Sequence, residues 1–415
     1  MLRTIASVYS LLTATAILLL GSGLLGTVVA LRAGLENFPK GVIGLIMSGF
    51  FAGYVAGSYL CPKLIRSFGH IRSFSAFAAI GCASVILHGL WVQPAVWLGL
   101  RAITGVAMLG IYLVIESWLN SLATDRTRGS LFAVYMTINL LALGAGQYLL
   151  LLYDVRSLAP FALTALFFSL ALVPIALTRM LQPAHVPPAR LGLRHLYRTS
   201  PLAVTGALVS GLVSGAFWGM GPIYALNAGF DKTGIALFMS GVIFGGALLQ
   251  WPLGHLSDRH DRRLVILWVS LLASAAALTV FLLIARQQSV SALLAAVLFG
   301  GCAFSIYSLS VAQANDHLDT EHVLETTRGL LLLSGIGAAL GPMAAGLLME
   351  WLGARMLMLY FAVLMVLLAG FAGLRRRLGE TIETKAQAEF VVMARTSPAV
   401  LELDPRAEPE DSSAP

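Results

Sequence analysis

Long apolar stretches, each free of charged side chains, alternate with short polar turns along almost the whole chain. Asp, Glu, Lys and Arg are absent from residues 4–31, 41–62, 73–100, 129–153, 157–178, 199–230, 233–257, 264–285, 287–315, 329–349 and 356–374. A helix that crosses a lipid bilayer needs about 20 apolar residues. The stretch 73–100 is interrupted near Gln93-Pro94 and, together with 102–118, supplies two such helices. The pattern therefore predicts an all-α membrane protein with twelve transmembrane helices.

The composition excludes a soluble globular protein. Hydrophobic residues make up 58% of the chain and charged residues 11%, and the mean hydropathy is +0.84. A soluble domain of this composition would aggregate. The composition therefore indicates a membrane protein.

Lys and Arg are distributed unevenly between the turns. Membrane proteins retain basic residues on the cytoplasmic side. With a cytoplasmic N-terminus, the turns on the opposite side contain only Arg32, Lys40, Arg156, Lys232, Arg286 and Arg355. This asymmetry predicts a multi-pass protein of the bacterial inner membrane with both termini in the cytoplasm. The net charge of +7 then reflects topology and contact with anionic membrane lipids, and it is no sign of nucleic-acid binding.

A proline-rich segment at 182–190 divides the chain into two sets of six helices. We expect an N-terminal half at 1–180, a cytoplasmic linker at 181–199 and a C-terminal half at 200–377. The remaining residues, 378–415, are rich in Pro, Ala, Glu and Asp. This composition predicts a disordered cytoplasmic tail.

The two halves repeat short sequence features. A basic turn at 254–263, Gly-His-Leu-Ser-Asp-Arg-His-Asp-Arg-Arg, has a weaker counterpart that begins at Gly57 and ends at Gly69–Arg72. An eight-residue spacing between Tyr and Asn also recurs, in Tyr112 and Asn120 and again in Tyr307 and Asn315. The duplication indicates two halves of common ancestry and architecture.

The basic turn resembles the loop motif Gly-x-x-x-Asp-Arg-x-Gly-Arg-Arg of the major facilitator superfamily, and Arg101-x-x-x-Gly105 is similar to a second motif of that family. Asp261 departs from the first motif, because Gly is usual there. With the run Glu116–Asn120, these departures make the chain most similar to bacterial permeases of the YcaD type. The resemblance implies the major facilitator fold, with two pseudo-symmetric six-helix halves that rock about a small-molecule substrate near mid-bilayer.

The resemblance also implies a gating role for the basic turns. Asp258 is expected to approach the N-terminus of a neighbouring helix, while Arg262 or Arg263 pairs with a carboxylate and latches the halves when the site faces outward. Asp316 is the expected acceptor in the second half, and Glu116 is the expected partner of Arg72 in the first. The alternative is a set of ordinary interfacial ion pairs that contribute little. The candidate gating residues are Asp258, Arg259, Arg262, Arg263, Arg72, Glu116, Asp316, Gly341 and Pro342.

Arg101 is the one basic residue inside a span, and ionisable residues within the membrane default to functional hypotheses. It would bind an anionic substrate or stabilise the cavity through backbone carbonyls. Aromatic, hydroxyl and amide residues at mid-depth suit a moderately apolar organic solute, although helix packing explains any one of them equally well. The candidate substrate-binding residues are Arg101, Tyr112, Ser214, Trp218, Tyr307 and Gln147.

These features favour a monomeric secondary transporter of a small organic solute, with proton coupling implied by the resemblance alone. One alternative is a non-transporting membrane sensor or lipid-handling protein on the same fold. A drug-efflux antiporter is disfavoured, because Gly341-Pro342 lies in the eleventh helix and not the fifth, and the first helix has no carboxylate. No enzymatic activity, cofactor or metal is expected. The His255, Asp258, His260 and Asp261 cluster belongs to the basic turn, and a nucleotide-binding loop is absent from the sequence.

Overall fold

The computed structural model describes residues 2–124, 127–177, 196–197, 200–286, 289–316, 323–378, 387, 390–393 and 395–403. Within these residues, twelve helices are long and apolar enough to cross a membrane. The predicted all-α fold of twelve transmembrane helices is thus confirmed. Most of the predicted linker at 181–199 lies outside the described residues.

The first half contains α1 (Leu2–Leu35), α2 (Lys40–Phe68), α3 (His70–Leu90), α4 (Pro94–Leu122), α5 (Arg128–Gly146) with η1 (Gln147–Leu151), and α6 (Ala159–Leu170) with α7 (Leu172–Ala176). The second half contains α9 (Pro201–Asn227), α10 (Lys232–Arg259), α11 (Arg262–Ala285), α12 (Ser289–Asn315), α13 (Val323–Leu352) and α14 (Met356–Leu378). The short helix η4 (Pro398–Leu403) follows in the tail.

The fourth helix begins at Pro94, where the interruption at Gln93-Pro94 predicted the division between the third and fourth spans. Pro94 occupies the first turn of α4, where its missing N–H costs no hydrogen bond and its fixed φ suits a helix. Arg101 therefore lies well inside the helix, and the chain buries it there with 4% of its surface exposed.

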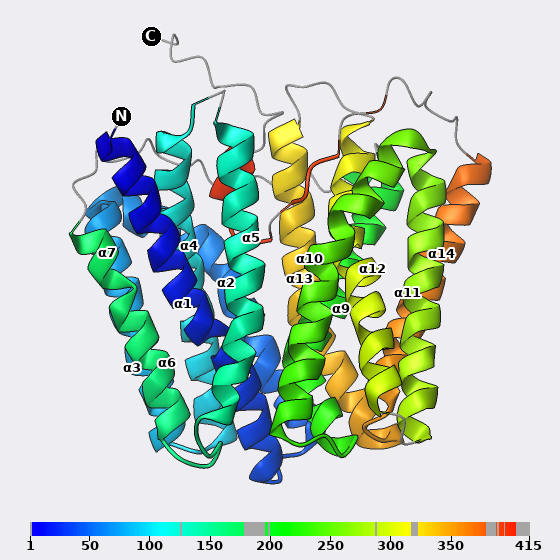
Figure 1. Ribbon diagram of the computed structural model, residues 1–415, viewed down its shortest axis with the longest axis horizontal. Helices are drawn as coiled ribbons and strands as arrows, with labels where there is room; N and C mark the ends of the chain where they lie inside the picture. The colour runs from blue at the N-terminus through cyan, green and yellow to red at the C-terminus, as the bar shows by residue number, and fades with distance from the viewer. Residues whose placement is uncertain are drawn as a thin grey trace.

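The two halves stand side by side with their helices roughly parallel (Figure 1). We call the end of the bundle where α1 begins, uppermost in Figure 1, the proximal end and the opposite end the distal end. At the distal end the halves touch through α2 and α13 and through α1 and α9. Small residues allow this approach, because a Cβ on Gly44 of α2 would collide with the carbonyl of Pro342 in α13.

The tail does not follow the predicted disorder throughout 378–415. Residues 390–393 and 395–403 lie against the proximal half of the bundle, where η4 contacts α4, α5 and α13. The apolar run Phe390–Met393 and the fully buried residues Ala399–Leu401 explain the difference, since burying them in the bundle removes them from water. Residues 404–415 lie outside the described residues.

Candidate functional site

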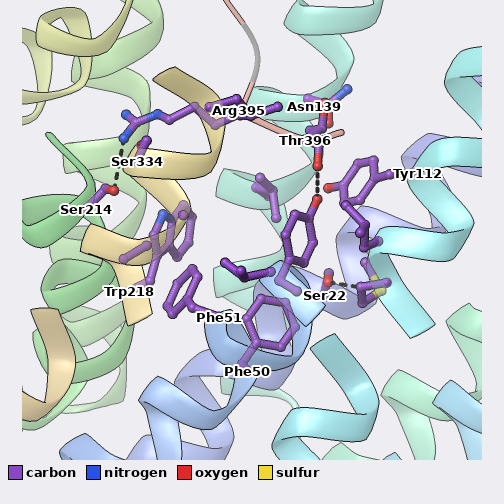
Figure 2. Close-up of a pocket in the computed structure, with 18 of the residues that line it drawn as sticks. Ser22, Phe50, Phe51, Tyr112, Asn139, Ser214, Trp218, Ser334, Arg395 and Thr396 are labelled. Atoms are coloured by element: carbon purple, nitrogen blue, oxygen red, sulfur yellow. Dashed lines mark hydrogen bonds between the residues drawn. The ribbon is translucent and has the colours of Figure 1, made fainter. Parts of the chain in front are cut away.

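A cavity of about 300 Å³ lies between the two halves and is lined by α1, α2, α4, α5, α9, α10, α12, α13 and the tail. Its volume is at the lower end of the range for small-molecule sites. The walls are mostly aromatic and aliphatic, with polar groups at separate points (Figure 2). The apolar lining includes Met47, Phe50, Phe51, Met108, Trp218 and Phe304, and the polar lining includes Ser22, Tyr54, Tyr112, Asn139, Ser214 and Gln250.

Arg101 supplies a positive charge to the cavity wall. Its guanidinium carbon lies 4.5 Å from the centroid of the Phe50 ring, a cation–π contact between α4 and α2. Its Nε is buried and has no hydrogen-bond partner in the described part of the chain. Across the cavity, Asn139 donates to the carbonyl of Tyr135, while its side-chain oxygen is likewise without a partner there. Both residues line the cavity, which makes them candidate polar contacts for a ligand.

Four of the six candidate substrate-binding residues line the cavity, namely Arg101, Tyr112, Ser214 and Trp218. Tyr112 packs against Tyr54 with the ring centroids 6.3 Å apart. The Trp218 ring packs edge-to-face against Phe217, with the ring centroids 5.6 Å apart. These residues come from α2, α4 and α9, so both halves contribute to one site.

Gln147 and Tyr307 lie outside the cavity lining, which corrects their assignment as substrate contacts. The Gln147 amide accepts a hydrogen bond from Thr27 at 2.6 Å and donates one to the carbonyl of Gly23 at 2.8 Å. These bonds hold η1 to α1 and occupy both ends of the amide. Tyr307 is fully buried one layer behind the wall, where its ring faces Arg395.

Sequence reasoning missed the contributions of α2 and the tail. Phe50, Phe51 and Tyr54 line the cavity, yet in the sequence they resemble ordinary packing residues of an apolar span. The candidate substrate-binding residues chosen from the sequence lie in the fourth, fifth, seventh and tenth spans, and none lies in the second. Arg395 and Thr396 also reach the cavity, and no local signal in a charged, proline-rich tail marks them.

Glu116 does not pair with Arg72, which corrects the expected first-half contact. Glu116 is fully buried and accepts hydrogen bonds from the Tyr135 hydroxyl, at 2.5 Å, and from the Ser397 hydroxyl. Arg72 is exposed near the start of α3. The carboxylate faces α5 and the tail, so hydroxyl groups take the place of the predicted arginine.

The basic turn of the second half forms the predicted ion pair between Arg262 and Asp316. Arg262 is 1% exposed and donates to Asp316 at 2.7 Å and to Asp258 at 2.9 Å. Asp258 also accepts the N–H of Phe390, which differs from the expected contact with a helix N-terminus. Asp261 instead caps α11 by accepting the N–H of Arg263. These bonds tie α10, α11, α12 and the tail together.

The other candidate gating residues have different surroundings. Arg259 is exposed at the end of α10. Gly341 packs so closely on α9 that a Cβ would collide with the Leu212 carbonyl, and Pro342 is the point where α13 meets α2. Gly341-Pro342 therefore lies where the two halves join at the distal end.

Twelve membrane-spanning helices in two halves, with a cavity enclosed between them, are the architecture of a multi-pass membrane transporter. The chain belongs to the major facilitator superfamily, whose family model matches residues 11–323 and 203–402.

Relatives agree with this assignment. A protein of Enterobacter sp. (strain 638), described as an uncharacterized MFS-type transporter, is 31% identical over 349 residues, or 82% of this chain and 88% of the relative. The MFS-type transporter YcaD of Escherichia fergusonii is 28% identical over 359 residues, or 85% of this chain and 91% of the relative. The predicted similarity to YcaD-type permeases is confirmed. The crystal structure of the nucleoside transporter NupG has the same fold, with a TM-score of 0.73 at 14% identity over 89% of this chain and 99% of that chain.

Proposed function

We propose that this chain is a secondary transporter that moves a small, moderately apolar organic solute through the central cavity by alternating access. The observation that carries the proposal is the cavity itself. It lies between the halves, has mostly apolar walls with several aromatic rings, and is lined by the polar side chains of Arg101, Asn139 and Ser214. Aromatic walls contribute apolar contact, and isolated polar groups orient the solute.

The proposed solute has a hydrogen-bond acceptor or an acidic group. Arg101 presents a guanidinium to the cavity, and its planar donors match a carboxylate or a similar group. Phe50 and Trp218 would enclose the apolar part of such a molecule. The cavity volume of about 300 Å³ restricts the solute to a small molecule.

We further propose that the proximal end faces the cytoplasm, in agreement with the distribution of Lys and Arg. The structure is then an inward-facing state whose outer side is closed by α2 against α13. A hydrogen bond between the Met343 N–H and the Ser48 hydroxyl, at 3.1 Å, supports that closure. Transport to the opposite side requires these contacts to separate while the proximal ends of the halves approach each other.

The proposal is tested in two stages. Untargeted metabolite comparison of cells with and without the protein gives candidate solutes, and uptake into proteoliposomes then measures transport directly. Arg101→Ala is expected to abolish uptake, because the solute loses its charged partner. Arg286→Ala, at an exposed position between α11 and α12, is the matched control and should keep wild-type uptake. Full uptake in Arg101→Ala would exclude the proposed solute contact.

A further inference from the structure

The C-terminal tail enters the space between the halves from the proximal end. Its first described run is held to the second half through its backbone. The N–H of Phe390 donates to Asp258, and the N–H of Met393 donates to the Ser308 hydroxyl, each at 3.0 Å. The Phe390 ring covers Gly254 on α10, where a Cβ would collide with it. The tail is thus docked on specific groups of α10 and α12.

Arg395 extends from this run into the cavity. One guanidinium nitrogen donates to the hydroxyl groups of Ser214, at 2.9 Å, and Ser210, at 3.1 Å. The guanidinium carbon lies 5.3 Å from the Tyr307 ring centroid and 5.8 Å from that of Phe304. Figure 2 shows Arg395 beside Ser214, on the same side of the pocket as Trp218. Arg395 thus forms a hydrogen bond with Ser214, which also lines the proposed solute site.

The next tail residues bind the first half. The Tyr54 hydroxyl donates to the Thr396 carbonyl, and the Ser397 hydroxyl donates to Glu116. Residues 398–401 are buried, and η4 contacts α4, α5 and α13. The described tail residues 390–393 and 395–403 therefore contact both halves across the cavity.

We propose that residues 390–393 and 395–403 form an autoinhibitory plug, which occupies the proximal opening of the cavity, competes with the solute and must leave before the proximal ends of the halves can meet. Two structural facts support this. The segment takes up hydrogen-bonding groups of the site, and it stands between helices that alternating access would bring together. The consequence for turnover rests on the proposed transport function, whereas the occupancy of the cavity does not.

The charge of Arg395 makes the plug reversible. Burial lowers the pKa of Arg395 to about 10, so the guanidinium stays charged at neutral pH. Its partners in the described residues are hydroxyl groups, a backbone carbonyl and ring faces, without a carboxylate. Arg395 is only partly buried, and a partly desolvated charge without a counter-ion is held weakly, because its desolvation offsets much of what its contacts contribute.

The plug is tested without any solute by labelling a cysteine in the cavity. Ser22→Cys is introduced after replacing Cys61, Cys82 and Cys302 by Ala, and a charged maleimide is added to inside-out vesicles. The double variant Arg395→Ala with Ser397→Ala lacks the side-chain hydrogen bonds that hold the plug. Its cysteine should therefore be labelled about tenfold faster than that of the parent. Arg406→Ala, in the same tail but outside the plug, should label at the parent rate. Equal rates in the two variants, or slower labelling in the double variant, would overturn the proposal.

A cross-link gives a second measurement in the full-length chain. Met393→Cys with Ser308→Cys joins the docked tail to α12, and oxidation should then slow labelling at Ser22→Cys until a reductant is added. Each single variant is the control and should not respond to the oxidant. Labelling that is unaffected by a formed cross-link would contradict the plug.

Once a solute is known, uptake separates the plug from the transport function. Arg395→Ala with Ser397→Ala should raise uptake over wild type if the tail inhibits. Lower uptake would mean that Arg395 completes the solute site, which overturns autoinhibition. If even the wild-type protein transports none of the candidate solutes, the transport function fails, while the labelling result still decides whether the tail fills the cavity.

Discussion

At the scale of single residues, buried polar groups in this bundle depend on one or two specific partners. Gln147 forms hydrogen bonds with Thr27 and the Gly23 carbonyl. Glu116 accepts hydrogen bonds from Tyr135 and Ser397. Water does not compete at these fully buried sites, so a lost partner leaves an unsatisfied group at a cost of about 1–3 kcal/mol. Residues whose partners lie within the fold should therefore affect stability, and residues that face the cavity should affect binding.

Gln147→Leu is expected to lower the free energy of unfolding by about 1–3 kcal/mol, because Thr27 and the Gly23 carbonyl lose their partner. The KM for the solute should not change, since the amide lies outside the cavity lining. Thermal unfolding in detergent and uptake kinetics measure the two effects. Thr137→Val is the control, because its hydroxyl bonds only the preceding turn of its own helix at an exposed position. An increased KM in Gln147→Leu would restore its assignment to the solute site.

We propose Glu116 as the carrier of a coupling proton, because its carboxyl group is buried on α4 one turn from the cavity residue Tyr112. Glu116→Gln should keep exchange of solute across proteoliposomes and lose accumulation driven by a pH gradient, because the amide cannot release a proton. His88 is the other titratable candidate, although its Nδ1 lies 2.7 Å from the Ser84 carbonyl within α3. Accumulation that persists in Glu116→Gln with His88→Ala would remove both residues from the coupling mechanism.

At the scale of helices, glycine determines which elements approach closely. A Cβ on Gly53 of α2 would collide with the Ala102 carbonyl of α4, and a Cβ on Gly215 of α9 would collide with the Ala338 carbonyl of α13. Lipid gives no hydrophobic driving force for helix association, so close van der Waals packing supplies the stability. A contact of the same kind between the halves, Gly44 of α2 against Pro342 of α13, closes the distal end of the cavity.

Gly44→Ala should weaken the distal closure, because the added methyl group collides with the Pro342 carbonyl. Overpacking of this kind costs about 1–3 kcal/mol, which corresponds to a roughly 5- to 150-fold change in the equilibrium between the open and closed states. Labelling of Met47→Cys by an impermeant maleimide from the distal side measures the change, in a background without native cysteines. Gly99→Ala is the control, since a Cβ there meets no atom within 4 Å. Equal labelling in the two variants would contradict this role of Gly44.

At the scale of the whole molecule, charge fixes orientation and the tail links the halves. The proximal end carries the basic turn at 254–263 and the Arg375–Arg377 cluster at the end of α14. Basic residues are retained on the cytoplasmic side, so the proximal end should face the cytoplasm.

Cysteines introduced at Asn37 and Asp231 should therefore react with an impermeant reagent from outside intact cells. A cysteine at Ala184, which lies outside the described residues, should react only from the inside. Wild-type chain without its native cysteines is the control for background labelling. Reaction of Ala184→Cys from outside would contradict the proposed orientation.

The sequence by itself determined the twelve spans, the repeat between the halves and the family. These features are local: the length and apolarity of each stretch decide its partition into lipid, and the motif residues are adjacent in the chain. The sequence also predicted that Asp316 pairs with an arginine of the basic turn, because the loop motif contains these arginines. It predicted four of the cavity residues, because their depth in the membrane places them near the centre of the bundle.

Only the tertiary structure decided which faces of the helices meet. Periodicity is weak in spans that are apolar all round, so the rotation of each helix depends on the packing of its neighbours. For that reason Phe50 lines the cavity, whereas Gln147 forms hydrogen bonds within the fold. Glu116 likewise accepts a hydrogen bond from Tyr135 and does not pair with Arg72. The tail is the extreme case, since Arg395 and Ser214 are 181 residues apart in the chain. A contact of that separation has no local signal, because it exists only once both halves have folded around the cavity.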